Sequence, residues 1–423
     1  MKMETKAVRL HGALDIRLDT FELPPLGKRD ILVEVLSNSL CTSTYKCAML
    51  GEKHKRVPAD IAQHPVILGH EMCIRILQLG EECPDKYQVG RRYALQTAIL
   101  PNTFDSAGYS FEFCGGNATY MIIPAAYVDV DALIEYTGKG AFEASLSEPY
   151  SCVIQAFHSN IHLSKGDYGV EVGTVKDGNM LLMAGVGSMG LAAIDYAINC
   201  DRKPKRLVVT GRNAVKLAHA AHVLSREMAA AEGVDLIYVN EKEPEDLQLR
   251  QSLLDLTNGQ GYNDIFVFAP SEKMVEMADS LLSYDGCLNF FAGPMDTEFK
   301  ASINFYNVHY NATHHCGSSG GSSSAMKESL EMMSEGRLNP AVLVSHVGGL
   351  NSAAEATLAL PKLQGFKKII YPHIEMPLTN IADFRKLGKT DPVLATLADI
   401  CEKNGGLWCA EAEQHLLKYG KRI

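Results

Sequence analysis

A glycine loop between an apolar segment and a helix-like segment places the strongest constraint on the fold. The stretch AGVGSMG puts Gly185, Gly187 and Gly190 in the pattern G-x-G-x-x-G. The run LLMA precedes the loop and LAAIDYAI follows it, which is the strand-then-helix context that the pattern requires. Such a loop lets a pyrophosphate approach the backbone, and the N–H groups of the first helical turn, at Ser188 and Met189, face the phosphate. The sequence therefore predicts a dinucleotide site at these five residues.

Strand-like and helix-like segments alternate after this loop. The runs RLVVTGR, IYVN, DIFVFAP and CLNFFAG are apolar and are separated by helical patterns. This alternation is typical of a doubly wound parallel sheet of the Rossmann type. The region before the loop differs, because short β-branched runs such as DIRLDTFEL and DILVEVLSNSL are separated by turn residues, which indicates a β-rich unit. The expected fold class is α/β.

Composition excludes several classes of protein. The formal net charge of −10 argues against a dedicated nucleic-acid binder, which needs clustered positive charge. No apolar run reaches the roughly 20 residues that span a bilayer, and MKMETKAVRLHG lacks the apolar core of a signal peptide. We expect a cytoplasmic protein without nucleic-acid or membrane partners. The eleven cysteines are scattered and form no C-x-x-C pair, which disfavours a structural zinc site.

The end of the second strand of this region bears on cofactor choice. NAD sites usually carry an acidic residue about 20 residues beyond the glycine loop. Here VVTGRN places Gly211 and Arg212 at that point. An arginine can pair with a 2′-phosphate, so NADP(H) is favoured and NAD(H) remains possible. The alternative interpretation is an ordinary solvated arginine at a strand end.

Three residues far apart in sequence could hold a metal. Catalytic zinc sites commonly take three protein ligands from separated positions, and Cys41, His70 and Glu148 supply a thiolate, an imidazole and a carboxylate. Spacing alone leaves the alternative open, because a lone histidine or cysteine is usually structural.

The order of these features resembles the zinc-containing medium-chain dehydrogenase/reductase family. The resemblance rests on Cys41 followed by Ser43, on Gly69-His70-Glu71, on Glu148-Pro149 and on the glycine loop. It implies a GroES-like catalytic domain at residues 1–154, a Rossmann domain at 155–316, and a return to the catalytic domain, with an extra tail, at 317–423.

The resemblance also implies roles for individual residues. Cys41, His70 and Glu148 would hold one catalytic zinc, with Glu71 as an exchangeable fourth ligand or a supporting group. Ser43 would begin the proton relay. Lys46 stands where family relays often have a histidine, and Thr44 stands where they have an aspartate, so the remainder of the relay stays open. The four-cysteine lobe of many members is absent, so no structural zinc is expected.

A glutamate as third ligand resembles the polyol dehydrogenase branch. Within it, SLCTSTYK, HKRVPADIAQHPVILGHE and SAGYSFEFCGGNATYMIIP look like the L-sorbose-1-phosphate reductases. The implied reaction transfers hydride between NADP(H) and a phosphorylated ketose or polyol, giving glucitol 6-phosphate, in a homodimer or homotetramer. The basic cluster at Lys53, Lys55 and Arg56 could bind the phosphate, although such clusters are often solvated loops. The alternative functions are a metal-free quinone reductase-like enzyme and a non-catalytic nucleotide-binding sensor.

Overall fold

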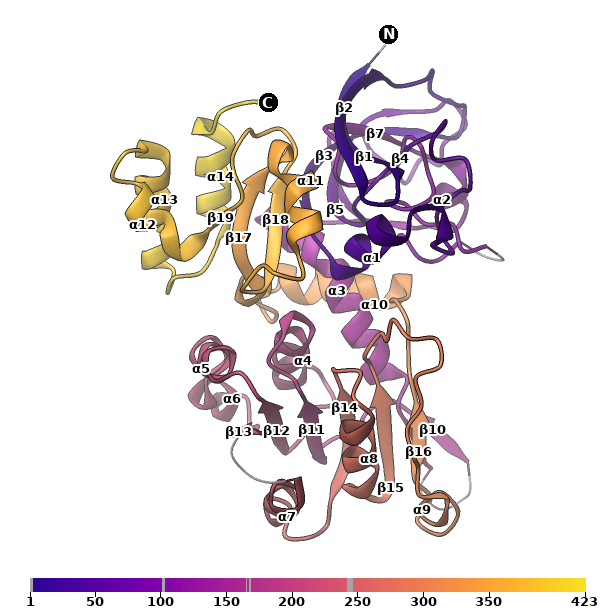
Figure 1. Cartoon of the computed structure of the whole chain (residues 1–423), viewed down its shortest axis with the longest axis vertical. Coiled ribbons are helices and arrows are strands. Elements are labelled where there is room, and N and C mark those ends of the chain that lie inside the picture. The colour runs from indigo at the N-terminus through magenta and orange to yellow at the C-terminus, as the bar shows by residue number, and fades with distance from the viewer. Residues whose placement is uncertain (1–2, 101–102, 165, 167–168, 242–245) are drawn as a thin grey trace. The chain divides into compact units, whose positions relative to one another are not determined.

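The computed structural model describes residues 3–100, 103–164, 166, 169–241 and 246–423 (Figure 1). It divides into two compact units. The first comprises Met1–Glu148, Ser322–Gly336 and Leu343–Ile423, and the second comprises Pro149–Gly321 and Arg337–Val342. The first division falls directly after Glu148, inside the helix α3 (Ala141–His158).

A parallel sheet forms the centre of the second unit. Its order is β13-β12-β11-β14-β15-β16, which is the 3-2-1-4-5-6 arrangement of a doubly wound nucleotide-binding fold. The strands are β11 (Asn179–Met183), β12 (Arg206–Gly211), β13 (Asp235–Asn240), β14 (Tyr262–Val267), β15 (Leu282–Phe290) and β16 (His314–Cys316). A separate hairpin joins β9 (Ile161–Leu163) and β10 (Val170–Val172). The predicted parallel sheet is confirmed.

Helices connect these strands. They are α4 (Ser188–Asn199), α5 (Ala214–Val223), α6 (Arg226–Ala231), α7 (Asp246–Asp255), α8 (Glu272–Ser280) and α9 (Phe305–Tyr310). The helical run that begins at NAVKLAHAAHV is interrupted at Ser225, whose side chain accepts a 3.2 Å hydrogen bond from the Met228 N–H and starts α6. Serine favours this position because its hydroxyl satisfies an N–H that the first turn leaves unpaired.

The first unit is built on an eight-stranded sheet in the order β19-β17-β18-β3-β5-β6-β8, with β7 paired to β3. The strands are β3 (Ile31–Ser39), β5 (Glu71–Leu79), β6 (Arg92–Leu95), β7 (Tyr120–Ile123), β8 (Leu133–Glu135), β17 (Val344–Gly349), β18 (Lys367–Tyr371) and β19 (Thr379–Asn380). A smaller sheet contains β1 (Glu4–Gly12), β2 (Asp15–Glu22) and β4 (Val66–Ile67). The expected β-rich unit is thus confirmed.

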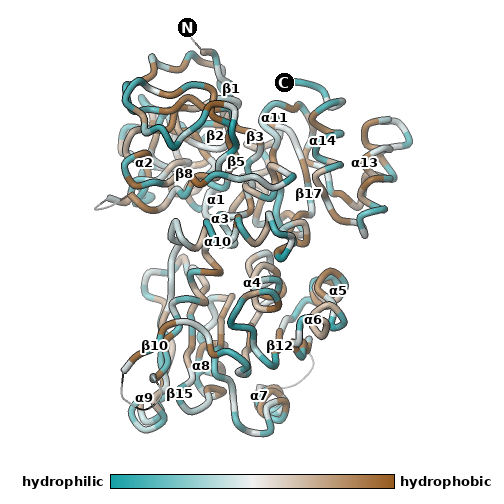
Figure 2. The backbone as a smooth tube through the Cα atoms, turned by 180° about the vertical axis from the view of Figure 1, so that it is seen from behind, coloured by the Kyte–Doolittle hydropathy of each residue, from teal (hydrophilic) through white to brown (hydrophobic). Residues whose placement is uncertain are grey.

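The helices of this unit are α1 (Thr42–Leu50), α2 (Ala125–Asp129), the start of α3, α10 (Ser323–Ser334) and α11 (Leu350–Ala359). The tail folds into α12 (Phe384–Leu387), α13 (Pro392–Lys403) and α14 (Ala410–Tyr419), and α14 lies between α13 and the β17–β18 strands (Figure 1). Hydrophobic and hydrophilic segments alternate along α13 in Figure 2, as expected of a helix that buries one face. In the described part of the chain, no helix is both long and apolar enough to cross a membrane.

Candidate metal centre and cofactor site

Two neighbouring antiparallel strands bring the predicted ligands together. Cys41 lies two residues after β3 and immediately precedes α1, while His70 immediately precedes β5 and Glu71 is its first residue. Ser39 and Glu71 are Cα partners across these strands. The end of β3 therefore lies beside the start of β5. This pairing brings the side chains of Cys41 and His70 together, although they are 29 positions apart in sequence.

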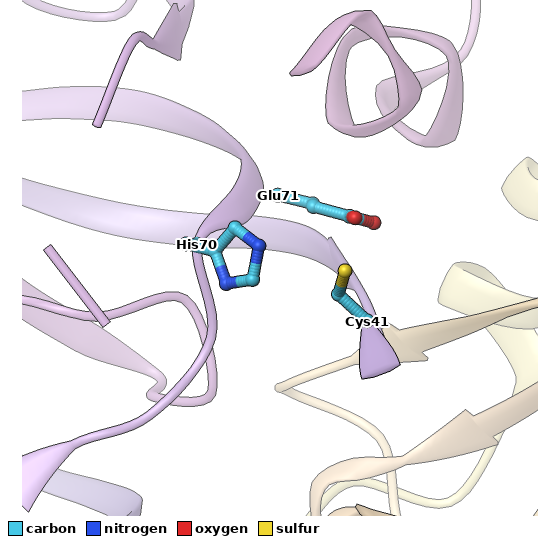
Figure 3. A group of neighbouring side chains, drawn as sticks. All are labelled: Cys41, His70 and Glu71. Carbon is cyan, nitrogen blue, oxygen red and sulfur yellow. The ribbon is translucent and has the colours of Figure 1, made fainter. Parts of the chain in front are cut away.

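The ligand atoms of Cys41, His70 and Glu71 all lie within 4.8 Å of one another (Figure 3). A thiol, an imidazole and a carboxylate form a donor set that suits zinc. The Glu71 oxygen Oε2 is buried without a hydrogen bond of normal geometry among the described residues. The nearby Ser39 hydroxyl contributes to lowering the pKa of this carboxyl group. Burial lowers the pKa of His70, which keeps the imidazole neutral as a metal ligand requires. The residues present thus fit a zinc ion.

Hydroxyl groups surround the imidazole. Thr44 Oγ1 lies 3.3 Å from His70 Nδ1, and Ser43 Oγ lies 3.3 Å from His70 Nε2. Ser43 donates to Cys41 Sγ at 3.0 Å and accepts from the Tyr109 hydroxyl at 2.9 Å. Ser43, the residue predicted to begin the proton relay, therefore lies next to the metal-binding cluster. Thr44 orients the His70 ring through its contact with Nδ1. Sequence reasoning missed Tyr109, because nothing in SAGYSF distinguishes it from a core tyrosine.

A buried lysine neutralises Glu71. Lys367, the first residue of β18, donates to Glu71 Oε1, and the two side chains are only 6% and 1% exposed. Burial alone would raise the pKa of Glu71, but Lys367 and His70 outweigh it and the pKa is lowered. Burial likewise opposes ionisation of Lys367, yet Glu71 and Cys41 raise its pKa. The sequence offered one signal for this residue, a lysine pair that opens the apolar strand KKIIYPH.

Glu148 lies outside the three-residue cluster but interacts with it electrostatically. The side chain sits on α3 and is buried, at 8% exposure. Burial raises the pKa of Glu148 to about 7, and His70 is the first of the groups that oppose this shift. Burial also raises the pKa of Cys41. A divalent cation would stabilise the ionised forms of both groups, because a coordinated thiol or carboxyl loses its proton.

The basic cluster separates into residues with different surroundings. Lys53 and Lys55 are exposed, and the Lys55 ammonium lies 5.2 Å from the Phe104 ring. Arg56 is partly buried, with its guanidinium 5.7 Å from the ring of Tyr109. Burial is the main cause of the lowered pKa of His70, and the positive charges of Lys367 and Arg56 lower it further. Of the three candidates, Arg56 is thus the one with contacts leading to the metal centre.

Lys46, the other candidate in this region, is partly buried on α1, four residues before the helix ends. Its role in a relay stays a prediction.

The glycine loop joins β11 to α4 in the second unit. Gly187 precedes the first helical residue, Ser188, and has no atom within 4 Å of an added Cβ. A Cβ on Gly190 would lie 2.1 Å from the Gly185 carbonyl oxygen, so the helix packs against the turn through this glycine. The second position of the motif is thus open and the third is closely packed, as a pyrophosphate loop needs.

The end of β12 has a feature that the sequence did not reveal. The Arg212 side chain is 74% exposed, and its Nε lies 3.7 Å from Oε2 of the buried Glu241. Glu241 also accepts a hydrogen bond from Thr210. A Cβ on Gly211 would lie 2.5 Å from Val186, so this glycine also serves loop packing. The acidic residue near the loop therefore comes from the end of the next strand, β13.

Comparisons with known proteins agree with this architecture. Residues 27–130 match the alcohol dehydrogenase GroES-like domain, and residues 185–335 match the zinc-binding dehydrogenase model. A putative zinc-binding dehydrogenase from Sinorhizobium meliloti bound to NADP superposes with a TM-score of 0.70 at 17% identity, covering 88% of this chain and all of that one. This likeness supports the fold.

Two full-length relatives are more similar in sequence. A mannitol-1-phosphate 5-dehydrogenase from Aliivibrio fischeri is 46% identical over 416 residues, which cover 98% of both chains. An L-sorbose 1-phosphate reductase from Klebsiella pneumoniae is 43% identical over 421 residues, covering 99% of this chain and 98% of that one. The chain belongs to the zinc-containing medium-chain alcohol and polyol dehydrogenases. It is a zinc-family oxidoreductase of the polyol and sugar-phosphate dehydrogenase type.

Proposed function

We propose that this enzyme transfers hydride between NADP(H) and a phosphorylated ketose or polyol, in the manner of an L-sorbose 1-phosphate reductase giving glucitol 6-phosphate. The observation that carries the proposal is the buried cluster of Cys41, His70 and Glu71, with the Ser43 hydroxyl beside it. Two relatives of nearly equal length, both named for sugar or polyol phosphates, support the substrate class.

Cys41, His70 and Glu148 would hold a single zinc, with Glu71 as the exchangeable ligand. Glu71 already binds the cationic side chain of Lys367. Burial raises the pKa of Glu148, so a bound zinc ion would stabilise the ionised form of this carboxyl group. When bound, zinc supplies a Lewis acid that polarises a carbonyl, and the reduced nicotinamide supplies the hydride.

Ser43 is suited to deliver the proton that completes carbonyl reduction. Its oxygen accepts from Tyr109, so its own hydrogen is left for another acceptor. That acceptor is Cys41 Sγ in the structure and would be the substrate oxygen during reduction. Burial raises the pKa of Tyr109, so its hydroxyl is protonated and donates to Ser43 before the reaction. As Ser43 gives its proton to the substrate oxygen, the Tyr109 proton would replace it, and solvent would return a proton to Tyr109. The two hydroxyls thus form a directed chain with its proton-donating end at the metal centre.

Substrate phosphate would bind Arg56. We expect Arg56→Gln to raise KM for a ketose 1-phosphate by about 10- to 100-fold, because a hydrogen bond to a charged group contributes about 1.5–3 kcal/mol. The KM for the free ketose should stay unchanged. The matched control is Lys53→Gln, which removes one positive charge from an exposed position of the same segment. Initial rates of NADPH oxidation with both sugars, with and without a chelator, test the function.

Equal wild-type rates with phosphorylated and free ketoses would contradict the phosphate site, whereas full activity after complete zinc removal would contradict the mechanism. The latter result would favour the quinone reductase-like alternative. Cofactor binding without turnover of any carbonyl substrate would favour the sensor.

Cofactor preference would depend on Arg212. We expect Arg212→Gln to lower kcat/KM for NADPH by about 10- to 100-fold through loss of its bond to the 2′-phosphate. The value for NADH should change little, which makes NADH the internal control. Steady-state kinetics with each cofactor at saturating sugar give the comparison. A wild-type enzyme with a strong preference for NADH would refute the role proposed for Arg212.

A further inference from the structure

The start of helix α3 is stabilised in part by its own Glu143, which accepts from the Gly140 N–H at 2.9 Å. The residue before the helix is Gly140, and the N–H groups of a first helical turn have no partner within the helix. Two of these groups are satisfied from the tail, because Glu413 on α14 accepts from the Ala141 N–H at 2.7 Å and from the Phe142 N–H at 3.2 Å. A Cβ on Gly140 would lie 2.6 Å from the Phe142 ring and 2.9 Å from Glu413 Oε2, so the glycine leaves room for both groups.

The capping carboxyl group is held firmly inside the first unit. Glu413 is only 3% exposed, and it is hydrogen-bonded by the Tyr371 hydroxyl, which itself accepts from Trp408 Nε1 at 2.7 Å. Burial raises the pKa of Glu413 to about 8, while the two backbone N–H groups and Arg92 oppose the shift and Glu143 adds to it. The two carboxyl oxygens nevertheless each accept one backbone N–H, and a glutamine could reproduce only one of these two hydrogen bonds, because its amide nitrogen is a donor.

The capped helix carries Glu148. Glu148 lies seven positions after Ala141, which is close to two turns of an α-helix. The position of the first turn consequently sets where the Glu148 carboxyl group lies. Because Glu148 acts electrostatically on His70 and Cys41, a shift of the helix would change the metal centre directly.

We propose that Glu413 is a positioning residue of the metal centre: by capping α3, the C-terminal tail fixes Glu148 for zinc. The inference rests on Glu148 being a ligand, as in the proposed function. It assigns to residues 377–423 a role in metal binding, although no residue of the tail belongs to the metal-binding cluster found among the described residues.

The test measures zinc affinity in the full-length protein, by competition with a chromophoric chelator, at a temperature well below the melting point of each variant. We expect Glu413→Ala to weaken zinc binding by about 10- to 100-fold, the range for groups that support a ligand. Glu413→Gln should give an intermediate affinity, because its amide oxygen can accept from one of the two α3 N–H groups while its NH2 group cannot accept from the other. Glu411→Ala is the matched control, since Glu411 lies on the same helix but is exposed.

Zinc binding by Glu413→Ala as tight as that of the wild type would overturn the inference, even if the variant melted at a lower temperature. If Glu413→Ala does not fold, Glu413→Gln decides, because it keeps only one of the two hydrogen bonds to α3. It should bind zinc several-fold more weakly than the wild type, and an affinity equal to that of the wild type would overturn the inference. If the wild type binds no zinc, both the proposed function and this inference are wrong. If the wild type binds zinc and the Glu413 variants bind it equally tightly, only this inference is wrong.

Discussion

Replacing Cys41 by serine is expected to remove zinc from the enzyme and nearly all carbonyl reduction with it. Loss of a ligand should exceed the about 10- to 100-fold loss of metal affinity seen for supporting groups. Since a Lewis-acidic metal contributes several kcal/mol to the transition state and each 1.4 kcal/mol is a factor of ten, kcat/KM should fall by about three orders of magnitude. Zinc content after gel filtration and NADPH oxidation rates provide the two measurements.

The matched control is Cys47→Ser, six residues further along in α1. Cys47 is fully buried among apolar side chains, and burial raises its pKa to about 12, so it cannot supply a thiolate at neutral pH. This variant should keep one zinc per chain and wild-type turnover. A Cys41→Ser enzyme with a full complement of zinc would contradict the ligand assignment, whatever its activity.

Lys367→Met is expected to lower the free energy of unfolding of the metal-free enzyme by about 3–5 kcal/mol, the usual effect of leaving one partner of a buried ion pair alone. Methionine keeps the length of the side chain and removes the charge, so Glu71 would remain ionised in a buried site or take up a proton. Denaturant unfolding of chelator-treated protein measures the loss. The loss should be smaller with zinc present, because the ion places positive charge beside Glu71.

A double-mutant cycle separates this ion pair from simple packing. Adding Glu71→Gln to Lys367→Met removes the unpaired charge, and the double variant should regain most of the lost stability. If the two losses simply add, the contact between Lys367 and Glu71 contributes no coupling energy and the interpretation of Lys367 as a neutralising partner is wrong.

The metal centre and the glycine loop differed in how far the sequence could predict them. The glycine loop was readable because its parts are contiguous: one strand, one turn and one helix determine which glycine must be open and which must be packed. Cys41 and His70 were also predictable, with Ser43 between them, but only through the order of motifs that the family shares. Their spacing alone gave no reason to bring them together.

The supporting residues could not be predicted, because their partners are distant in sequence. Lys367 is 296 positions from Glu71, and Glu413 is 272 positions from Ala141. A lysine in an apolar strand or a glutamate on a tail helix has no local pattern that identifies its partner. The same holds for Glu241, which reaches the end of β12 only because parallel strands align their carboxyl ends at one edge of the sheet.

The sequence by itself determined the fold class and the glycine loop, because these depend on local periodicity and on a short contiguous motif. It predicted the zinc ligands only through the order of motifs along the chain. Only the tertiary structure decided how the buried charges are balanced. It showed that Glu71 is neutralised by Lys367, that burial raises the pKa of Glu148, and that the tail caps the helix carrying Glu148. The physical reason is that desolvation and ion pairing depend on distance through the folded core and not on distance along the chain.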